Sequence, residues 1–363
     1  MKKKKKRDRR RRIILAACGV QLLAAVICFG LWQWLANLLP SQKEAERWQG
    51  EGELAFSQVS CFLPESGLIE LQNIADARSQ VMKAMDEASL DTKGPQQLML
   101  DAWSTSSRLY TSGEHGRGEV SVIAVGGDYF DFHPIRLLSG NYLRQSDLMD
   151  DRILLSTEVA WLLFGGTDLH GMTMKLNGVP FMIAGVVEQE TDFASREANS
   201  DGMDLYMSYD GLLRLQEEVK ISCYECVLAE PVNGFAQRTM KEIFSDEKIE
   251  VICNTTRYQY GKLVDLMLRY GIRGARTTGA VLPYWESAAR ITENWAGLCC
   301  LAGTLLLIMP CVCACIWVVQ SFRRVREKME SDTIPEVKER VEEGIRVRQR
   351  RRWERQHGEH EKK

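Results

Sequence analysis

The chain has 363 residues, 45% of them hydrophobic and 26% charged, and its formal net charge of −2 hides a polarised distribution. Ten of the first twelve residues are Lys or Arg, and a second basic cluster lies at residues 323–328, whereas acidic residues outnumber basic ones between them. Because both basic runs border uncharged segments, we interpret them as membrane flanks, and nucleic acid is not expected as a partner.

Two uncharged segments are long enough to cross a membrane. Neither the run from Ile13 to Leu39 nor the run from Asn294 to Phe322 contains Asp, Glu, Lys or Arg. At 1.5 Å of rise per residue, a helix over either run exceeds a hydrocarbon core of about 30 Å. The first run is also longer than the apolar core of a signal peptide, so we expect an uncleaved anchor.

The charged flanks predict how these spans are oriented. Cytoplasmic flanks are enriched in Lys and Arg, so the basic N-terminus, residues 1–12, and the basic tail, residues 323–363, are both expected in the cytoplasm. Anionic lipid headgroups would attract both segments. Transmembrane helices are then predicted at residues 13–39 and 293–322, and residues 40–292 form the extracytoplasmic domain of a plasma-membrane protein.

The first half of this domain shows strand and helix patterns in turn. Residues 54–63 have the pattern of a strand, and apolar residues near helical spacing predict a helix over residues 66–90. Two further strands, at residues 104–111 and 119–125, are separated by a Gly-rich turn and are expected to pair.

The next segment contains the clearest local signal, a hairpin. A short strand at residues 153–156 precedes a helix at residues 158–164, which Gly165 would end. Apolar strands then flank Asn177-Gly178, a pair that favours a type I′ turn because both positions need positive φ. We predict the two strands of this hairpin at residues 172–176 and 179–187.

The last part of the domain completes an α+β pattern. The polar residues 188–202 are predicted to form a loop. The order of all elements indicates a mixed α+β domain with an inserted β-rich lobe at about residues 141–205, flanked by the two transmembrane helices. The remaining strands are predicted at residues 205–207, 221–228 and 249–253, and the remaining helices at residues 231–244 and 258–270.

One helix is expected to connect the domain to the second span. Pro283 suits the first turn of a helix, and no helix breaker follows it before the span begins. A continuous helix would transmit tilt or rotation of the domain into the bilayer. This coupling helix starts with Pro283, Tyr284, Trp285, Glu286 and Arg290.

The domain also holds four of the eleven cysteines, Cys61, Cys223, Cys226 and Cys253. Outside the cytoplasm they could form one or two disulfides, with the pairing left open. Cys223 and Cys226 match C-x-x-C, but they lie in an alternating strand pattern that directs them to opposite faces of a sheet. A redox motif is therefore not expected.

An ordered series of short motifs resembles a known family. The series begins with Val-Gly-Gly-Asp-Tyr-Phe at residues 125–130 and ends with Gly-Val-Val at residues 185–187. It resembles the extracytoplasmic core domain of MacB-type ABC transporter permeases, within the wider FtsX-like group. The motif residues, to which we assign structural roles, are Gly127, Asp128, Tyr129, Phe130, Gly140, Asp147, Phe164, Gly165, Gly171, Asn177, Gly178 and Gly185.

The resemblance implies a transport role, with one departure. A permease of that type has three spans after the outer domain, whereas one span and a charged tail follow here, so the chain looks like a version truncated to two spans. It also lacks the G-x-x-x-x-G-K-[ST] phosphate loop of a motor. We therefore expect a non-enzymatic subunit that works with a separate ABC ATPase and a multi-span permease, and that could form homo-oligomers.

Two other functions stay open. The domain could instead bind a ligand and signal to the tail, in which residues 336–356 are predicted to form a helix that lies on the membrane or docks a protein. An extracytoplasmic enzyme is least favoured, because no nucleophile, base and orienting group occur together and because His115, His133 and His170 lack metal-ligand spacing with another His or Cys. No catalytic, cofactor or metal site is expected.

Overall fold

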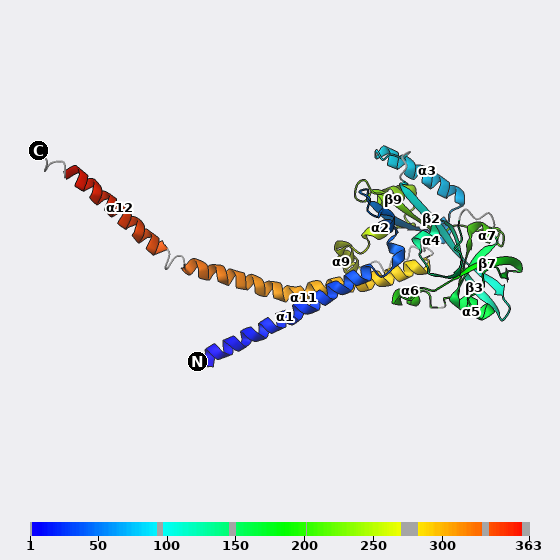
Figure 1. The fold of residues 1–363 in the computed structure, drawn as a ribbon, viewed down its shortest axis with the longest axis horizontal. Coiled ribbons are helices and arrows are strands. Elements are labelled where there is room, and N and C mark those ends of the chain that lie inside the picture. Colours follow the sequence, from blue (N-terminus) through cyan, green and yellow to red (C-terminus); the bar gives the residue numbers. More distant parts are fainter. Residues whose placement is uncertain are drawn as a thin grey trace. The chain divides into compact units, whose positions relative to one another are not determined.

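The computed structural model describes residues 2–92, 97–144, 150–200, 202–269, 282–328 and 334–357. The chain divides into two compact units, one of Cys28–Leu301 and one of Met1–Ile27 with Ala302–Lys363. Two long helices, α1 (Lys2–Ala36) and α11 (Tyr284–Lys328), each contribute residues to both units (Figure 1).

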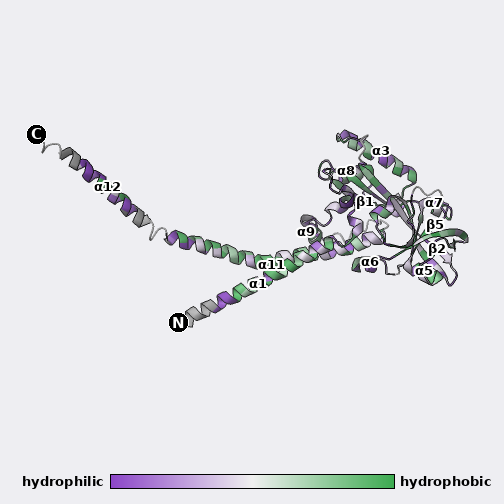
Figure 2. Ribbon diagram, viewed as in Figure 1, coloured by the Kyte–Doolittle hydropathy of each residue, from purple (hydrophilic) through white to green (hydrophobic). Residues whose placement is uncertain are grey.

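The described residues of the terminal unit are helical. Both α1 and α11 contain a stretch long and apolar enough to cross a membrane, at Arg9–Ala36 and Tyr284–Glu327. Hydrophobic residues follow one another along these stretches, whereas α12 (Ile334–His357) is mostly hydrophilic (Figure 2). The predicted tail helix is therefore confirmed. Pro310 lies inside α11 and removes one amide donor from its hydrogen-bond ladder.

The other unit is built on one ten-stranded sheet with the order β10-β1-β9-β2-β3-β8-β5-β7-β4, and β6 pairs with β2 and β7. Two of its neighbouring pairs, β3 with β8 and β5 with β7, are parallel. The strands are β1 (Phe56–Phe62), β2 (Met99–Ser112), β3 (Arg117–Gly127), β4 (Leu137–Gly140), β5 (Arg152–Ser156), β6 (Thr173–Leu176), β7 (Val179–Val187), β8 (Asp204–Ser208), β9 (Cys223–Ala229) and β10 (Glu250–Cys253).

Short helices surround this sheet. One face is covered by α3 and α8, and there Tyr224 of β9 packs on Phe244 with ring centroids 5.8 Å apart (Figure 1). The helices of this unit, besides parts of α1 and α11, are α2 (Glu44–Gln49), α3 (Leu71–Glu87), α4 (Tyr129–Phe132), α5 (Thr157–Phe164), α6 (Phe193–Ala198), α7 (Tyr209–Leu213), α8 (Phe235–Ile243) and α9 (Tyr260–Leu268), with 3-10 turns η1 (Pro40–Gln42), η2 (Glu65–Gly67) and η3 (Asn254–Thr256).

Several local predictions are confirmed. The hairpin of β6 and β7 turns at Asn177 and Gly178, whose φ angles of 48° and 87° are those that a type I′ turn requires. The helix α5 ends at Gly165, which has a φ of 72°. The strands β2 and β3 pair in antiparallel register over eleven residue pairs, a longer ladder than predicted.

The predicted β-rich lobe continues the same sheet. Its strands β5 and β7 lie side by side, and β5 also pairs with β8, which pairs with β3. The fold is thus a mixed α+β domain in which the inserted segment extends the sheet sideways, flanked by the two candidate transmembrane helices.

Three local predictions were wrong. The polar segment 188–202 was expected to be a loop but contains α6, whose N-terminal amides at Ala194 and Ser195 donate to the Asp192 carboxylate. The helix expected from residue 66 begins at Leu71, because Ile69 pairs in extended form with Ile221. The first long helix ends at Ala36 and not at residue 39, since the chain turns before Pro40.

Candidate functional site: the junction between α11 and the sheet

The motif residues Tyr129 and Phe130 meet the start of α11. The ring of Tyr129 lies 5.8 Å from the ring of Trp285, and His133 lies 4.5 Å from both of these rings. Trp285 is 2% exposed and Tyr129 is 1% exposed. We call the set Tyr129, Phe130, His133, Tyr206, Tyr284 and Trp285 the aromatic junction. It joins two features that the sequence indicated separately, the family motif and the coupling helix.

The backbone before Tyr129 explains why the motif contains glycine. Gly127 has a φ of 66°, and a Cβ atom there would lie 2.3 Å from the carbonyl oxygen of Asp101. The next amide, that of Asp128, donates to this same oxygen at 2.9 Å. Only glycine allows this approach without strain, and the resulting turn starts α4 and directs Tyr129 towards Trp285.

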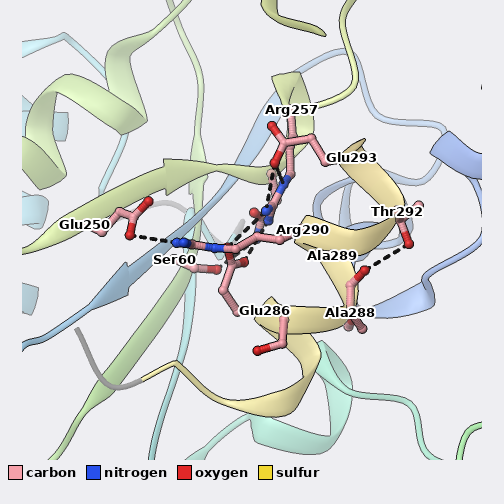
Figure 3. A network of polar contacts seen from close by, with 12 residues as sticks. Ser60, Glu250, Arg257, Glu286, Ala288, Ala289, Arg290, Thr292 and Glu293 are labelled. Atoms are coloured by element: carbon pink, nitrogen blue, oxygen red, sulfur yellow. Dashed lines mark hydrogen bonds and ion pairs between the residues drawn. The ribbon is translucent and has the colours of Figure 1, made fainter. Parts of the chain in front are cut away.

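A cluster of charged side chains holds the next turns of α11. Arg257 forms two parallel hydrogen bonds to the Glu286 carboxylate, at 2.7 and 3.0 Å, and also lies 3.1 Å from Glu293 (Figure 3). Arg290 links Glu286 at 2.7 Å to Glu250 of β10 at 2.6 Å. We call these five residues the ion cluster. Glu286, Arg290 and Glu293 are spaced i, i+4, i+7, so they share one face of α11.

Burial of the ion cluster strengthens the effect of its charges on the pKa values of Glu286 and Arg257. Arg257 is 2% exposed and Glu286 is 1% exposed. Burial alone would raise the pKa of Glu286, but the Arg257 and Arg290 guanidinium groups outweigh it and lower that pKa below its ordinary value. Burial would lower the pKa of Arg257, and its two carboxylate partners raise it instead. Glu286 and Arg257 are therefore both charged at neutral pH.

A second buried polar network lies beneath Trp285. His133 Nε2 is 2.6 Å from one Glu225 carboxylate oxygen, and the other oxygen accepts a hydrogen bond from the Ser60 hydroxyl at 2.8 Å. The Asn254 amide in turn donates to Ser60 at 2.8 Å. Ser60 and Glu225 are register partners in β1 and β9, so they point to the same face of the sheet. That face receives α4 and the start of α11.

The partners of these groups were not predicted from the sequence. Glu286 and Arg290 were assigned to the coupling helix, but Arg257, Glu293, Glu250, His133 and Glu225 were not singled out. The i, i+4, i+7 charges just before an uncharged span were a readable signal. No local pattern identifies Arg257 as their partner, because it lies 29 residues before Glu286.

The other motif residues are distributed over the sheet. Gly140 of β4 opposes Gly185 of β7, and a Cβ atom at Gly140 would lie 2.0 Å from the Ala184 carbonyl oxygen. Gly171 has a φ of 83°, and Phe164 is buried in the core. Asp147 lies outside the described residues. Pro283 directly precedes α11, and its carbonyl accepts a hydrogen bond from the Ser287 amide at 3.2 Å.

The four cysteines of the domain are all free thiols in this structure, so the disulfides that they could form are not present. They are also buried. Cys223 and Cys226 lie three residues apart in β9, and they point to opposite faces as the strand pattern predicted. Cys226 is opposite Val59 in β1, as is Cys253 of β10.

A pocket of about 100 Å³ opens beside the aromatic junction. It lies where the parallel strands β3 and β8 end, a place where mixed sheets commonly bind ligands. Its walls include the rings of Tyr129, Phe130 and Trp103, and charged residues such as Arg152 and Asp210 line it as well. Tyr129 therefore contacts both the pocket and Trp285 of α11.

Comparisons with known proteins agree with the resemblance. The family model of the MacB-like periplasmic core domain matches residues 68–234, a range that contains the whole motif series. An uncharacterized ABC transporter permease, YvrN of Bacillus subtilis (strain 168), is 33% identical over 84 residues. That match covers 22% of this chain and 20% of the relative, so the chain spans about a fifth of that protein.

Solved structures of similar domains are more distant in sequence. The periplasmic region of MacB from Actinobacillus actinomycetemcomitans is 18% identical, with a TM-score of 0.39 over 60% of this chain and 96% of that one. The extracellular domain of the noncanonic ABC-type transporter YknZ from Gram-positive bacteria is 13% identical, with a TM-score of 0.37 over 54% and 99%. From the family match, residues 68–234 form a MacB-like periplasmic core domain, and two helices of the same chain are long and apolar enough to cross a membrane.

Proposed function

We propose that the chain is a non-enzymatic membrane subunit of an ABC transporter assembly, and that α11 couples its extracytoplasmic domain to a separately encoded ATPase and permease. The observation that carries this proposal is the anchoring of α11. Its first turns hold Trp285 in the core and Glu286 in a buried ion pair, so they cannot separate from the sheet without exposing both.

The free-energy cost of separating α11 from the sheet favours joint movement of α11 and the domain. Pulling α11 away would leave Arg257 or the Glu286 carboxylate buried without its partner, which costs about 3–5 kcal/mol for a pair of this kind. Removing Trp285 from its site would cost a similar amount. A change of tilt or rotation in the domain is therefore passed to α11, and the membrane-spanning part of the same helix follows it.

The assembly is tested by co-purification of the full chain in mild detergent. We expect an ABC ATPase and a multi-span permease to be recovered with it. Recovery of the chain alone, or as a homo-oligomer without either component, would contradict the proposal. Deleting residues 334–363 in parallel shows whether the tail, which includes α12, holds the ATPase or only lies on the membrane.

The orientation is part of the same proposal: both termini lie in the cytoplasm, and residues 40–292 lie outside. Two exposed tryptophans make a matched pair of probes, Trp161 on α5, which is 59% exposed, and Trp353 on α12, which is 61% exposed. A membrane-impermeant maleimide should label Trp161→Cys in intact cells and should label Trp353→Cys only after lysis. The reverse pattern, or labelling of both in intact cells, would show that the orientation is wrong.

A second candidate function is ligand sensing, which the pocket beside Tyr129 favours. A ligand there would contact the aromatic junction directly and could alter the position of α11. This function predicts a cytoplasmic regulatory partner that is lost on deleting residues 334–363, with transport unchanged. Co-purification of an ATPase that survives this deletion would favour the transport subunit instead.

A further inference from the structure

The helix α9 lies against the two helices that enter the membrane. Its Leu263 is completely buried in a small cluster with Leu35 of α1 and with Ala296 and Cys300 of α11. Met267 covers Gly297, where an added Cβ atom would lie 2.9 Å from the methionine methyl carbon. These contacts lie apart from the main core of the sheet.

The segment just before α9 contacts α1 as well. The indole nitrogen of Trp32 donates a hydrogen bond to the Tyr258 carbonyl oxygen at 3.1 Å, and its ring lies 6.1 Å from that of Tyr260. Residues 258–268 are thus fastened to α1 and to α11 at the same level. The depth of these contacts relative to the bilayer follows from the length of the uncharged run in α11.

The contacted part of α11 belongs to an uncharged run. That run, Asn294–Phe322, holds 29 residues, whereas a hydrocarbon core of about 30 Å needs about 20 at 1.5 Å of rise each. On the outer side this leaves roughly nine residues, about 13 Å of helix, which pass through a headgroup layer of about 5–8 Å and slightly beyond it. Ala296, Gly297 and Cys300 lie among these residues, so α9 lies at the depth of the headgroups.

The outward side of α9 has the composition of a membrane-interface helix. Leu268 is 76% exposed and Tyr260 is 42% exposed. Arg269 pairs with Asp265 at 2.8 Å and Lys262 donates to the Thr256 hydroxyl, so charged side chains accompany these apolar ones at the surface. Burying such a leucine side chain in the acyl region removes apolar surface from water and is favourable. Amphipathic residues of this kind are typical of helices that lie in the headgroup–acyl boundary.

A second contact lies on the other side of α1. Phe193 of α6 is 39% exposed and stacks on Trp34, with ring centroids 6.5 Å apart and an interplanar angle of 20°. Trp32 and Trp34 are two residues apart in a helix, about 200° of rotation, so α9 and α6 contact opposite faces of α1 (Figure 1). Trp34 is itself 55% exposed, and Trp295 is 54% exposed.

We propose that α9, through Leu268 and Tyr260, and α6, through Phe193, insert into the outer headgroup–acyl boundary of the bilayer. The partner of this surface is the lipid itself. The domain would then rest on the membrane on two sides of its spans, which limits its tilt. This inference does not depend on a transport or a sensing role.

Photo-cross-linking in nanodiscs of phosphatidylcholine tests this surface. The full chain would carry p-benzoyl-phenylalanine in place of Leu268 or Phe193. The control carries it in place of Trp161 on α5, whose exposure of 59% lies between the 76% of Leu268 and the 39% of Phe193 (Figure 1). After irradiation, intact-protein mass spectrometry should show adducts with the mass of the lipid at positions 268 and 193, at least tenfold more abundant than at position 161.

Three results would overturn the proposal. These are equal lipid adducts at all three positions, no lipid adduct at position 268, and a covalent dimer at position 268, which would make α9 a protein interface instead. Leu268 is mostly exposed, so its replacement removes little packing. A second variant, Leu268→Glu, tests the proposal without a photo-cross-linker. Its charged side chain should lift α9 out of the bilayer, so proteolytic cleavage within residues 258–269 should be at least threefold faster than in the wild type in nanodiscs. In detergent, the two cleavage rates should be equal.

Discussion

Replacing Arg257 with methionine is expected to lower the free energy of unfolding by about 3–5 kcal/mol, the cost of leaving buried carboxylates without their partner. Glu286 and Glu293 lose four hydrogen bonds from this guanidinium, and Glu286 has 1% of its side chain exposed. Chemical denaturation of the full chain in detergent micelles, followed by circular dichroism, measures this change.

Arg290→Met is the matched control for this experiment. Arg290 also contacts Glu286, but its side chain is 27% exposed and its partner Glu250 is 25% exposed, so solvent screens the pair. We expect a clearly smaller loss than for Arg257→Met. Equal losses for the two variants would show that the buried position of Arg257 does not matter, which contradicts our interpretation of the ion cluster.

The same variants should differ in pH dependence. The pKa of Glu286 is lowered in the folded protein, so its contribution to stability is present above the unfolded value of about 4.3 and is lost as the pH falls through the folded pKa. Without Arg257, only Arg290 still opposes the effect of burial, so the pKa of Glu286 rises relative to the wild type. The deficit of Arg257→Met should therefore be largest at neutral pH and should narrow towards pH 4–5. A deficit that is constant from pH 8 to pH 4 would rule out this electrostatic origin.

Trp285→Ala is the second substitution with a large expected effect. Its side chain is 2% exposed and contacts Tyr129, His133 and Tyr284, and truncating a tryptophan in such a site costs about 3–5 kcal/mol. The same denaturation experiment measures it. In a complex with the ATPase, the variant should also lose the effect of the outer domain on ATP hydrolysis, because α11 would no longer be held by the family motif.

Two further tryptophan variants test whether the loss of stability in Trp285→Ala comes from lost packing in the aromatic junction. Trp285→Phe should cause a smaller loss, since the ring contact is retained and the Trp285 indole nitrogen has no hydrogen-bond partner among the described residues. Trp161→Ala, at a position that is 59% exposed, should stay within about 0.5 kcal/mol of the wild type. A wild-type response of ATP hydrolysis in Trp285→Ala would argue against coupling through the aromatic junction.

Much of the local structure could be predicted because it depends on neighbouring residues. Asn177-Gly178 specifies its hairpin through backbone conformation, and Gly165 ends α5 for the same reason. The candidate spans followed from length and the absence of charge. Polar segments were less predictable: α6 forms because Asp192 caps it and because Ala194 packs against Ala288 and Ala289, contacts that no local pattern contains.

The sequence by itself determined the two apolar spans, the main strands and helices between them, and the motif series of the family, because each depends on residues close together in the chain. Only the tertiary structure decided that β9 lies between β1 and β2, and that Arg257 meets Glu286 and Glu293. The physical reason is that burial, and not sequence spacing, selects such partners. A charge removed from water must find an opposite charge wherever the fold brings one.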